Sequence, residues 1–346
     1  MKRLKYLLVY LLPLSVYISF TSKGLLTFTP LFLFFVLVPL IELLIPADSS
    51  NFTKEVAAKE KDKVFYSLIL YLTLPVQIIF LFFFFKVIQE PNLSTLEYLG
   101  RIDSMAFMCG VIGINVGHEL GHRSNRVEQL IGELLLLTSI NTHFLPYHNE
   151  GHHRNVATPN DAATARKNEW VFTFWLRSHF GSYIEAWQIE NKRMAKKAYS
   201  KISIHNKMVV YSLTTVLFLT AIYFFYGSFV FLSFLLAAIV GIALLETVNY
   251  IEHYGLLRHK KENGKYERVK HVHSWNSDHI LGRLFLFNLS RHSDHHYKGS
   301  KKYQILESVP KSPQMPTGYP GMIILALFPP LWFWYMNKQL SKFQKI

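Results

Sequence analysis

The residues of this chain best suited to chemistry are its histidines. There are 16 in 346 residues, and nine of them fall into four compact groups. The groups are His118-Glu-Leu-Gly-His122, His148-Asn-Glu-Gly-His152-His153, His253 in Asn249-Tyr-Ile-Glu-His-Tyr-Gly255, and His292-Ser-Asp-His295-His296. Imidazole is the commonest metal ligand in proteins. Three clusters of two or three histidines, together with His253, therefore predict a metal site.

Helical spacing indicates which histidines can bind the same ion, because residues three or four apart share one face of an α-helix. Three pairs have this spacing: His118 with His122, His148 with His152, and His292 with His296. His153 and His295 are each adjacent in sequence to a paired histidine, so their side chains point about 100° away around the helix. They can therefore reach a second ion, and we expect two metals in one chamber.

The ligands alone do not identify the metal, since imidazole binds zinc, copper, iron and nickel. The first group matches the H-E-x-x-H pattern of zinc proteases, with Glu119 as the general base. A catalytic zinc takes three protein ligands, which would leave most of the clustered histidines unused. A hydrolase is therefore the weaker interpretation.

The elements that must position these histidines are hydrophobic. Half of the residues (50%) are apolar and 17% are charged, against about 25% charged in an average domain. The single cysteine, Cys109, excludes a disulfide framework and a cysteine-held iron–sulfur cluster. The apolar content excludes a disordered chain. These properties predict an all-α integral membrane protein.

Six apolar segments approach the roughly 20 residues that a spanning helix needs. They are residues 6–20, 25–45, 64–87, 99–117, 208–225 and 228–250. The first is expected to be an uncleaved anchor, since no small-residue cleavage site follows it. Residues 118–207 and 251–346 are expected to form a helical, histidine-rich cap. The chain shows no repeat or linker, so we treat residues 1–346 as a single domain.

The basic residues predict the orientation. The connections on one side of the membrane, 21–24, 88–98 and 226–227, hold a single lysine, Lys23. The other side holds the N-terminus, the lysine-rich loop 46–63 and all four histidine groups, and by the positive-inside rule it is cytoplasmic. The net charge of +14 therefore reflects the orientation of the chain in the membrane. No nucleic-acid motif accompanies it, so we expect no nucleic-acid partner.

Two further segments are expected to lie at the membrane interface. Residues 169–201 begin with aromatic side chains and end in basic ones, which is typical of an amphipathic anchor. Docking of an acidic redox partner is the alternative role for this segment. Residues 321–334 are interrupted by Pro329 and Pro330, which predicts a re-entrant or interfacial segment rather than a seventh span.

A stripe of glycines runs along the fourth expected span. Gly113, Gly117 and Gly121 recur every four residues, a pattern that lets membrane helices approach closely. Because His118 and His122 lie beside this stripe, we expect the helix to pack against another ligand-bearing helix.

The position of the site favours oxidation of a hydrocarbon. The histidine groups lie where apolar helices meet the cytoplasm, so a substrate can enter from lipid, and a chamber lined by Phe and Leu suits a hydrocarbon chain. Attack on an unactivated C–H bond needs O2 and a redox metal, and two non-haem irons satisfy the number of ligands. A metal transporter is disfavoured because, apart from Glu42 and Asp103 near span ends, the spans carry few charged groups.

Four segments resemble the signatures of the membrane alkane 1-monooxygenases, within the fatty acid desaturase/hydroxylase superfamily. They are H-E-L-G-H-R (118–123), H-N-E-G-H-H-R-N-V-A-T-P-N-D-A-A-T-A-R (148–166), N-Y-I-E-H-Y-G-L (249–256) and L-S-R-H-S-D-H-H (289–296). Residues 273–277 and 316–322 are also similar to that family. The resemblance runs from the second span to near the C-terminus.

The resemblance implies an enzyme with six transmembrane helices, which we expect in the bacterial inner membrane. The basic residues predict that both termini and the active site are on the cytoplasmic side. It implies a non-haem di-iron centre that hydroxylates the terminal carbon of medium-chain n-alkanes to 1-alkanols with O2. The implied iron ligands are His118, His122, His148, His152, His153, His253, His292, His295 and His296. Related chemistry on an aromatic methyl group or a fatty acyl chain is the alternative.

The electrons for this reaction must come from a separate protein. The chain has no G-x-G-x-x-G or C-x-x-C motif, and no haem-thiolate motif surrounds Cys109, so we expect no bound flavin or haem. The resemblance implies rubredoxin with its reductase, or a ferredoxin. Such carriers are typically acidic, and the basic cytoplasmic face offers a docking surface.

Three departures from the family pattern flank the implied ligands. Tyr147 stands where Glu is usual, Ser290 where Gln is usual, and Tyr297-Lys-Gly replaces small-x-Pro. Six carboxylates are close enough in sequence to accept a hydrogen bond from a ligating imidazole: Glu119, Glu150, Asp161, Glu252, Asp278 and Asp294. On this basis we expect Asp294→Asn to lower iron retention.

The other seven histidines lack the repeated spacing. His271 and His273 are expected near the site, and the rest in solvated or interfacial positions: His143, His179, His205, His259 and His279. Chain-length preference is expected to depend on bulky residues of the second and third spans, including Phe32, Phe34 and Phe35.

Overall fold

The computed structural model describes residues 3–343, which are mostly helical. Within this range the β-pairing is limited to two isolated bridges, Lys260 with Tyr266 and Asn276 with Gln314. The all-α prediction is therefore confirmed. The helices form two compact units: the first comprises Met1–Val36, Val64–Pro146 and Glu185–Leu245, and the second comprises Leu37–Lys63, Tyr147–Ile184 and Glu246–Ile346.

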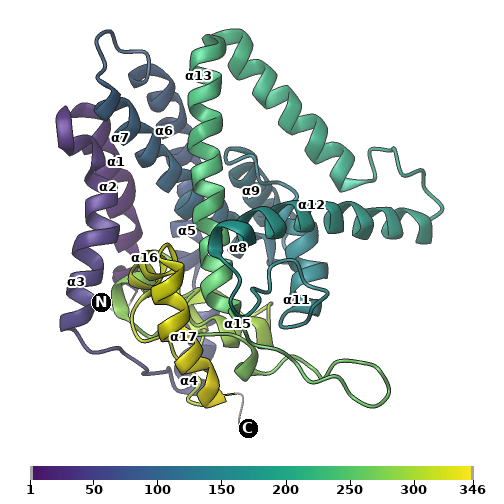
Figure 1. Ribbon diagram of the computed structural model, residues 1–346. Coiled ribbons are helices and arrows are strands. Elements are labelled where there is room, and N and C mark those ends of the chain that lie inside the picture. Colours follow the sequence, from purple (N-terminus) through teal and green to yellow (C-terminus); the bar gives the residue numbers. More distant parts are fainter. Residues whose placement is uncertain (1–2, 344–346) are drawn as a thin grey trace. The chain divides into compact units, whose positions relative to one another are not determined.

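Five helical stretches among residues 3–343 are long and apolar enough to cross a membrane: Leu4–Thr21, Gly24–Leu44, Val64–Val87, Thr95–Gly121 and Lys207–His253. The first four agree closely with the predicted spans. The fifth, α13 (Lys207–His253), contains both remaining predictions. Gly227 in its interior is not helical (φ 81°, ψ 174°), so α13 consists of two helices that meet at a bend, and this conformation favours glycine. Each side of this bend (Figure 1) retains enough residues for a span.

The first unit contains most of α13 and a series of shorter helices. The shorter helices are η1 (Leu4–Tyr10), α1 (Leu11–Thr21), η2 (Gly24–Phe28), α2 (Thr29–Phe32), α5 (Val64–Tyr71), α6 (Thr73–Val87), α7 (Thr95–Phe107), η4 (Met108–Ile114), α8 (Asn115–Gly121), α9 (Arg126–Leu137) and α10 (Phe144–Pro146). Ser94 and Glu97 form a capping box at the start of α7. Glu97 Oε1 also accepts a hydrogen bond from the Gly24 amide at 3.0 Å, so the same residue fixes the turn before η2.

The glycine stripe brings η4 and α8 against α9. A Cβ at Gly117 would lie 2.8 Å from Leu136 Cγ and 3.0 Å from the Gly132 carbonyl oxygen. The predicted close approach is therefore confirmed. The prediction of a ligand-bearing partner helix is wrong, however, because α9 carries no histidine. The stripe packs the helix that bears His118 against α9.

The second unit contains short helices joined by ordered loops. They are α3 (Val38–Leu44), α4 (Lys54–Lys61), η5 (Tyr147–His152), α11 (His153–Asn155), η6 (His271–His273), α14 (Ile280–Phe285), α15 (His292–Tyr297), η7 (Tyr303–Ile305), α16 (Tyr319–Ala326) and α17 (Pro329–Phe343); the π-helix η3 (Leu33–Leu37) leads into α3. Aromatic side chains build the core of this unit. Trp332 packs against the rings of Tyr250 and Tyr254 at 5.3 Å.

Two polar contacts tie the second unit's membrane segment to its short helices. Glu42 on α3 accepts a hydrogen bond from the Gly282 amide of α14 at 2.7 Å. Trp275, which is fully buried, donates from its indole nitrogen to the Tyr254 carbonyl oxygen at 3.0 Å. The latter bond holds the segment before α15 against the end of α13.

The expected interfacial segments are helical. Helix α12 (Val171–Lys196) exposes Phe172, Leu176 and Phe180, which recur every four residues and therefore form one apolar stripe. Residues 319–343 form α16 and α17, separated at Pro329, and neither helix is long and apolar enough to be a span. Both observations agree with the sequence prediction.

Candidate metal centre

In the first unit, His118 lies on α8 and His122 is the residue that caps the C-terminal end of this helix. Their Nε2 atoms lie 3.0 Å apart, as four-residue spacing on an α-helix predicts. The His118 side chain is buried and packs edge-on against Phe144, with ring centroids 5.6 Å apart. Both side chains therefore present a nitrogen to the same point.

In the second unit, the sequence cluster that contains His148, His152 and His153 does not follow α-helical spacing. Residues Tyr147–His152 form a π-helix, η5, which continues into α11. The wider π-helical turn brings residues five apart onto one face, so His148 faces His153 with Nε2 atoms 3.0 Å apart. The predicted pairing of His148 with His152 is therefore replaced by a pairing with His153, and His152 is turned toward other partners.

Three segments of the second unit converge on one point. The ligand nitrogens of four buried histidines, His152, His253, His292 and His296, all lie within 4.8 Å of one another. The His292 Nε2 atom is 3.1 Å from that of His253 and 2.9 Å from that of His296. We call these residues the four-histidine group. They come from η5, from the end of α13 and from α15.

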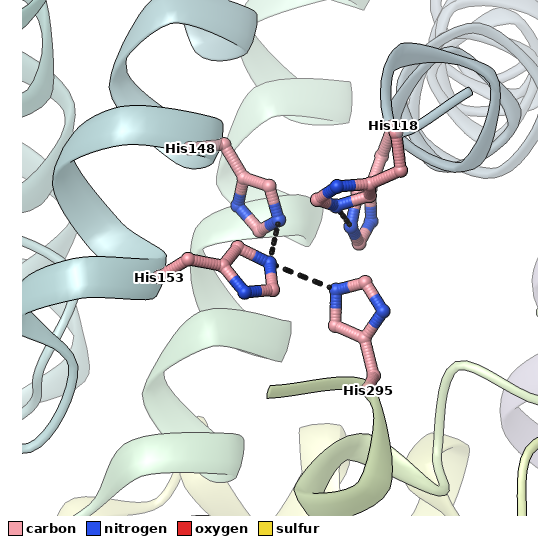
Figure 2. A group of neighbouring side chains, drawn as sticks. His118, His148, His153 and His295 are labelled. Carbon is pink, nitrogen blue, oxygen red and sulfur yellow. Dashed lines mark hydrogen bonds between the residues drawn. The ribbon is translucent and has the colours of Figure 1, made fainter. Parts of the chain in front are cut away.

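A second convergence in the same unit joins His148, His153 and His295, drawn in Figure 2. The His153 Nε2 atom lies between its two partners, 3.0 Å from His148 Nε2 and 3.1 Å from His295 Nε2. We call these residues the three-histidine group. The second unit therefore gathers seven of the nine predicted ligands around two points, and the first unit carries the remaining two.

These nitrogens cannot all satisfy one another by hydrogen bonding. A neutral imidazole nitrogen either donates a proton or accepts one, and it cannot do both. His292 Nε2 faces two other Nε2 atoms, and so does His153 Nε2, so at most one contact in each trio is a hydrogen bond. A cation placed among the lone pairs would satisfy every nitrogen at once.

The protonation state of the histidines also fits metal binding. Burial, and after it the neighbouring imidazoles, lower the pKa of His295 and His296 well below the usual value. Both side chains are therefore held neutral, which is the form that ligates metals. A set of imidazole nitrogens is suited to a first-row transition metal.

Asp161 orients one member of the four-histidine group. Its Oδ2 atom lies 2.9 Å from His152 Nδ1, which leaves His152 Nε2 directed at the group. The carboxylate also accepts hydrogen bonds from the Tyr147 and Thr164 hydroxyls, both at 2.6 Å. Burial of Asp161 favours its neutral form, but His152 and these donors lower its pKa to about 2. Tyr147, a departure from the family pattern, therefore supports His152 through Asp161.

Glu252 reaches the four-histidine group directly. Its buried Oε2 atom lies 3.2 Å from His292 Nε2, the nitrogen that faces His253 and His296. Its Oε1 atom accepts a hydrogen bond from the Tyr319 hydroxyl at 2.7 Å. We expected Glu252 to hold the outer nitrogen of a ligand; the structure instead places its carboxylate beside the inner one. Tyr319 was not predicted as a site residue, although it lies in the family-like segment 316–322.

The other four predicted carboxylates have different partners. The Glu150 side chain is exposed. The remaining contacts are Glu119 with Arg123 at 2.6 Å, Asp278 with the Ser308 hydroxyl at 2.5 Å, and Asp294 with Lys301 at 2.7 Å. Asp294 Oδ1 also lies 3.6 Å from Nε2 of His271, which belongs to neither group. The expectation that Asp294 supports an iron ligand therefore loses its basis.

The histidines outside the groups have mixed environments. His271 stacks on Tyr297 beside α15, with ring centroids 4.2 Å apart, and His273 Nε2 lies 3.3 Å from Glu267 Oε1. Both are near the site, as expected. His205 and His259 are exposed, as expected, whereas His143 is buried, contrary to the expectation.

The two other departures from the family pattern have clear positions. The Ser290 hydroxyl donates to the Ser277 carbonyl oxygen at 2.7 Å and is buried, so it joins the segments that precede α14 and α15. Tyr297 is 60% exposed and directly follows His296. It therefore forms part of the surface next to the four-histidine group.

Comparison with known proteins agrees with this geometry. A family model for fatty acid desaturases matches residues 104–326, which include all nine clustered histidines. Alkane 1-monooxygenase 1 of Alcanivorax borkumensis is 38% identical over 303 residues, covering 88% of this chain and 74% of the relative. Alkane 1-monooxygenase 1 of Pseudomonas aeruginosa is 38% identical over 309 residues, covering 88% and 80%.

The name of a more distant relative indicates a different class of hydrocarbon substrate. The xylene/toluene monooxygenase hydroxylase component of Pseudomonas putida is 27% identical over 287 residues, covering 81% of this chain and 75% of the relative. The two alkane 1-monooxygenases share more residues with the chain over a similar length. The chain therefore belongs to the membrane alkane 1-monooxygenase family, within the fatty acid desaturase superfamily.

Proposed function

We propose that this protein hydroxylates the terminal carbon of medium-chain n-alkanes to 1-alkanols at a non-haem di-iron centre. The observation that carries the proposal is the convergence of seven imidazoles on two points within the second unit. Two such points match two metal ions, and imidazole nitrogens suit iron. The names of the alkane 1-monooxygenase relatives supply the substrate class.

The proposed ligands are the nine clustered histidines. The four-histidine group would hold one iron and the three-histidine group the other, and His118 and His122 are proposed as the remaining ligands. The Nε2 geometry of that pair, at 3.0 Å, is the same as within the other groups. Since the ligands come from both units, and the family model extends through both, we propose that residues 1–346 act as a single domain.

The reaction consumes one O2, two electrons and two protons for each alkane. One oxygen atom enters the C–H bond of the methyl group and the other leaves as water. The irons, when bound, would supply the redox chemistry for this step. The chain itself keeps His295 and His296 neutral by burial and fixes the ring of His152 through Asp161.

The electron donor is proposed to be rubredoxin or a similar acidic carrier. Tyr297, which directly follows His296, is exposed and stacks on the half-buried His271, and the neighbouring Lys298 is also exposed. This surface therefore combines a short route to a ligand with positive charge. We propose that it faces the cytoplasm of a bacterial cell from the inner membrane, with both termini on the same side, because the basic loops lie with the histidines.

Two other functions give distinguishable results. A related di-iron hydroxylase or desaturase would act on an aromatic methyl group or a fatty acyl chain, and the xylene/toluene relative supports the former. A zinc hydrolase would use Glu119 as its base. That carboxylate forms an ion pair with Arg123 at 2.6 Å, which opposes such a role.

Product analysis tests the proposal. The purified protein in lipid nanodiscs is supplied with iron, a rubredoxin system, ¹⁸O2 and a series of C6–C16 alkanes. We expect 1-alkanols that carry ¹⁸O at the terminal carbon. An alkene without label, or hydroxylation of xylene with no alkane product, would contradict the proposal. A His295→Ala variant provides the background from non-enzymatic oxidation.

A further inference from the structure

The loop between α12 and α13 presents an apolar tip. Ile202 and Ile204 are each 84% exposed, and Tyr199 is 46% exposed. The three side chains lie within six residues of one another, in a loop that is otherwise polar. Exposed isoleucines next to a membrane span indicate contact with something apolar.

This tip is built into the fold. Asn206 is fully buried and donates to the Lys201 carbonyl oxygen at 2.8 Å, while its side-chain oxygen accepts from the Met208 amide at 2.9 Å. The rings of Tyr199 and His205 stack at 4.2 Å with an angle of 14°. These contacts close the two ends of the loop, so Ile202 and Ile204 are held outward by an ordered backbone.

The base of the same loop is strongly basic. Four lysines, Lys192, Lys196, Lys197 and Lys201, have exposed side chains, and none of them forms an ion pair in the part of the chain that the structure describes. The other cations are neutralised: Arg193 pairs with Glu190 at 2.7 Å and Lys207 with Glu133 at 3.0 Å. No Asp or Glu occurs at positions 191–207.

The position of the loop in the chain indicates what its apolar tip contacts. Helix α13 enters its membrane span at Lys207, immediately after the loop, so the loop lies at the membrane interface. We infer that residues 192–206 form a binding site for anionic phospholipid: Ile202 and Ile204 insert between the acyl chains, and the four lysines bind the phosphate-bearing headgroups. Apolar side chains at the tip and cations at the base match the order of acyl chain and headgroup in a bilayer.

Site-specific fluorescence tests the insertion. The natural Cys109 is buried, so a bimane label can be attached to Ile204→Cys in the full chain in nanodiscs. We expect its emission to shift to the blue, to be quenched by brominated phospholipid, and to be protected from acrylamide. The control is Asn263→Cys, an exposed position in a polar turn of the second unit, which should behave as a label in water.

Lipid retention tests whether the four lysines bind the phospholipid headgroups. Native mass spectrometry counts the phosphatidylglycerol molecules that each chain keeps on release from detergent. We expect affinity for phosphatidylglycerol to fall about fivefold for each of the four lysines changed to Gln. The matched control changes four exposed cations of the second unit to Gln: Lys260, Lys261, Lys265 and Arg268.

Three results would overturn the inference. The first is an Ile204 label that remains accessible to acrylamide in discs containing phosphatidylglycerol. The second is a label that becomes shielded on adding an acidic redox protein, or only when two chains share a disc, which would assign the tip to a protein partner. The third is equal loss of phosphatidylglycerol in the lysine variant and the matched control. None of these readouts depends on iron or on turnover, so they are independent of the proposed hydroxylation.

Discussion

The Oδ2 atom of Asp161 lies 2.9 Å from the Nδ1 atom of His152. This contact fixes the ring so that its opposite nitrogen, Nε2, points at the four-histidine group. Carboxylate partners of this kind orient a ligating imidazole and increase its basicity. The position of a nitrogen in the proposed centre therefore depends on a residue nine positions away in the sequence.

Replacing Asp161 by Asn should weaken iron binding. The amide cannot carry the negative charge that stabilises His152, so we expect iron affinity to fall roughly ten- to a hundredfold. Competition with a graded series of chelators, read by metal analysis of the detergent-purified protein, measures this change.

Asp294→Asn is the matched control for Asp161→Asn. Asp294 lies in the histidine-rich α15, but its carboxylate contacts Lys301 rather than a member of either group. We expect iron affinity to stay within about twofold of the unmodified protein, because no ligand loses its orienting partner. Equal losses in the two variants would refute the assignment of Asp161.

The hydroxyl of Tyr319 should stabilise the protein through Glu252. Tyr319→Phe removes the donor to Oε1 and leaves a buried carboxylate oxygen unpaired, which costs about 1–3 kcal/mol. We expect a lower melting temperature in detergent, measured by intrinsic fluorescence. Tyr335→Phe in α17 is the control, since the Tyr335 hydroxyl forms no hydrogen bond within residues 3–343. A melting temperature unchanged by Tyr319→Phe would exclude this role.

The preference for alkane chain length should change when Phe34 is replaced and stay the same when Phe32 is replaced. Phe34 is 5% exposed and stacks on Phe107 with ring centroids 5.6 Å apart, whereas Phe32 is 58% exposed. Phe34→Leu opens space inside the first unit, so we expect the product distribution to move toward longer alkanes. Phe32→Leu should leave the distribution unchanged, and a shift in that variant alone would place the substrate path elsewhere.

Electron transfer should depend on charge near Tyr297. Lys298→Glu reverses an exposed charge beside the His271–Tyr297 stack, so we expect the KM for an acidic donor to rise several-fold, with kcat nearly unchanged. The KM should also rise with salt, because exposed charges are screened beyond about 10 Å at 0.1 M. Lys196→Glu at the end of α12 is the control. A rise in KM for Lys196→Glu but not Lys298→Glu would move the dock to α12.

The histidine pattern predicted most of the candidate site. Two- and three-residue clusters at helical spacing identified His118 with His122 and His292 with His296, and the structure brings both pairs together. The pairing in the second cluster was mispredicted because a sequence does not show that Tyr147–His152 adopts a π-helix. One extra residue per turn exchanges His152 for His153 as the neighbour of His148.

Contacts between distant segments were the least predictable feature. Asp161 and Asp294 are equally close in sequence to predicted ligands, and only the fold shows that the former contacts His152. Tyr319 contacts Glu252 across 67 positions, which no local pattern encodes. Hydropathy located the spans well, including the connection at residues 226–227, where Gly227 is not helical.

Metal content of the detergent-purified protein tests the central claim most directly. Plasma mass spectrometry, combined with protein quantification by amino-acid analysis, gives the number of each metal per chain. Our account predicts about two irons, one for each histidine convergence, and little zinc. A single zinc per chain that persists after reconstitution with ferrous iron would contradict the di-iron centre and restore the hydrolase.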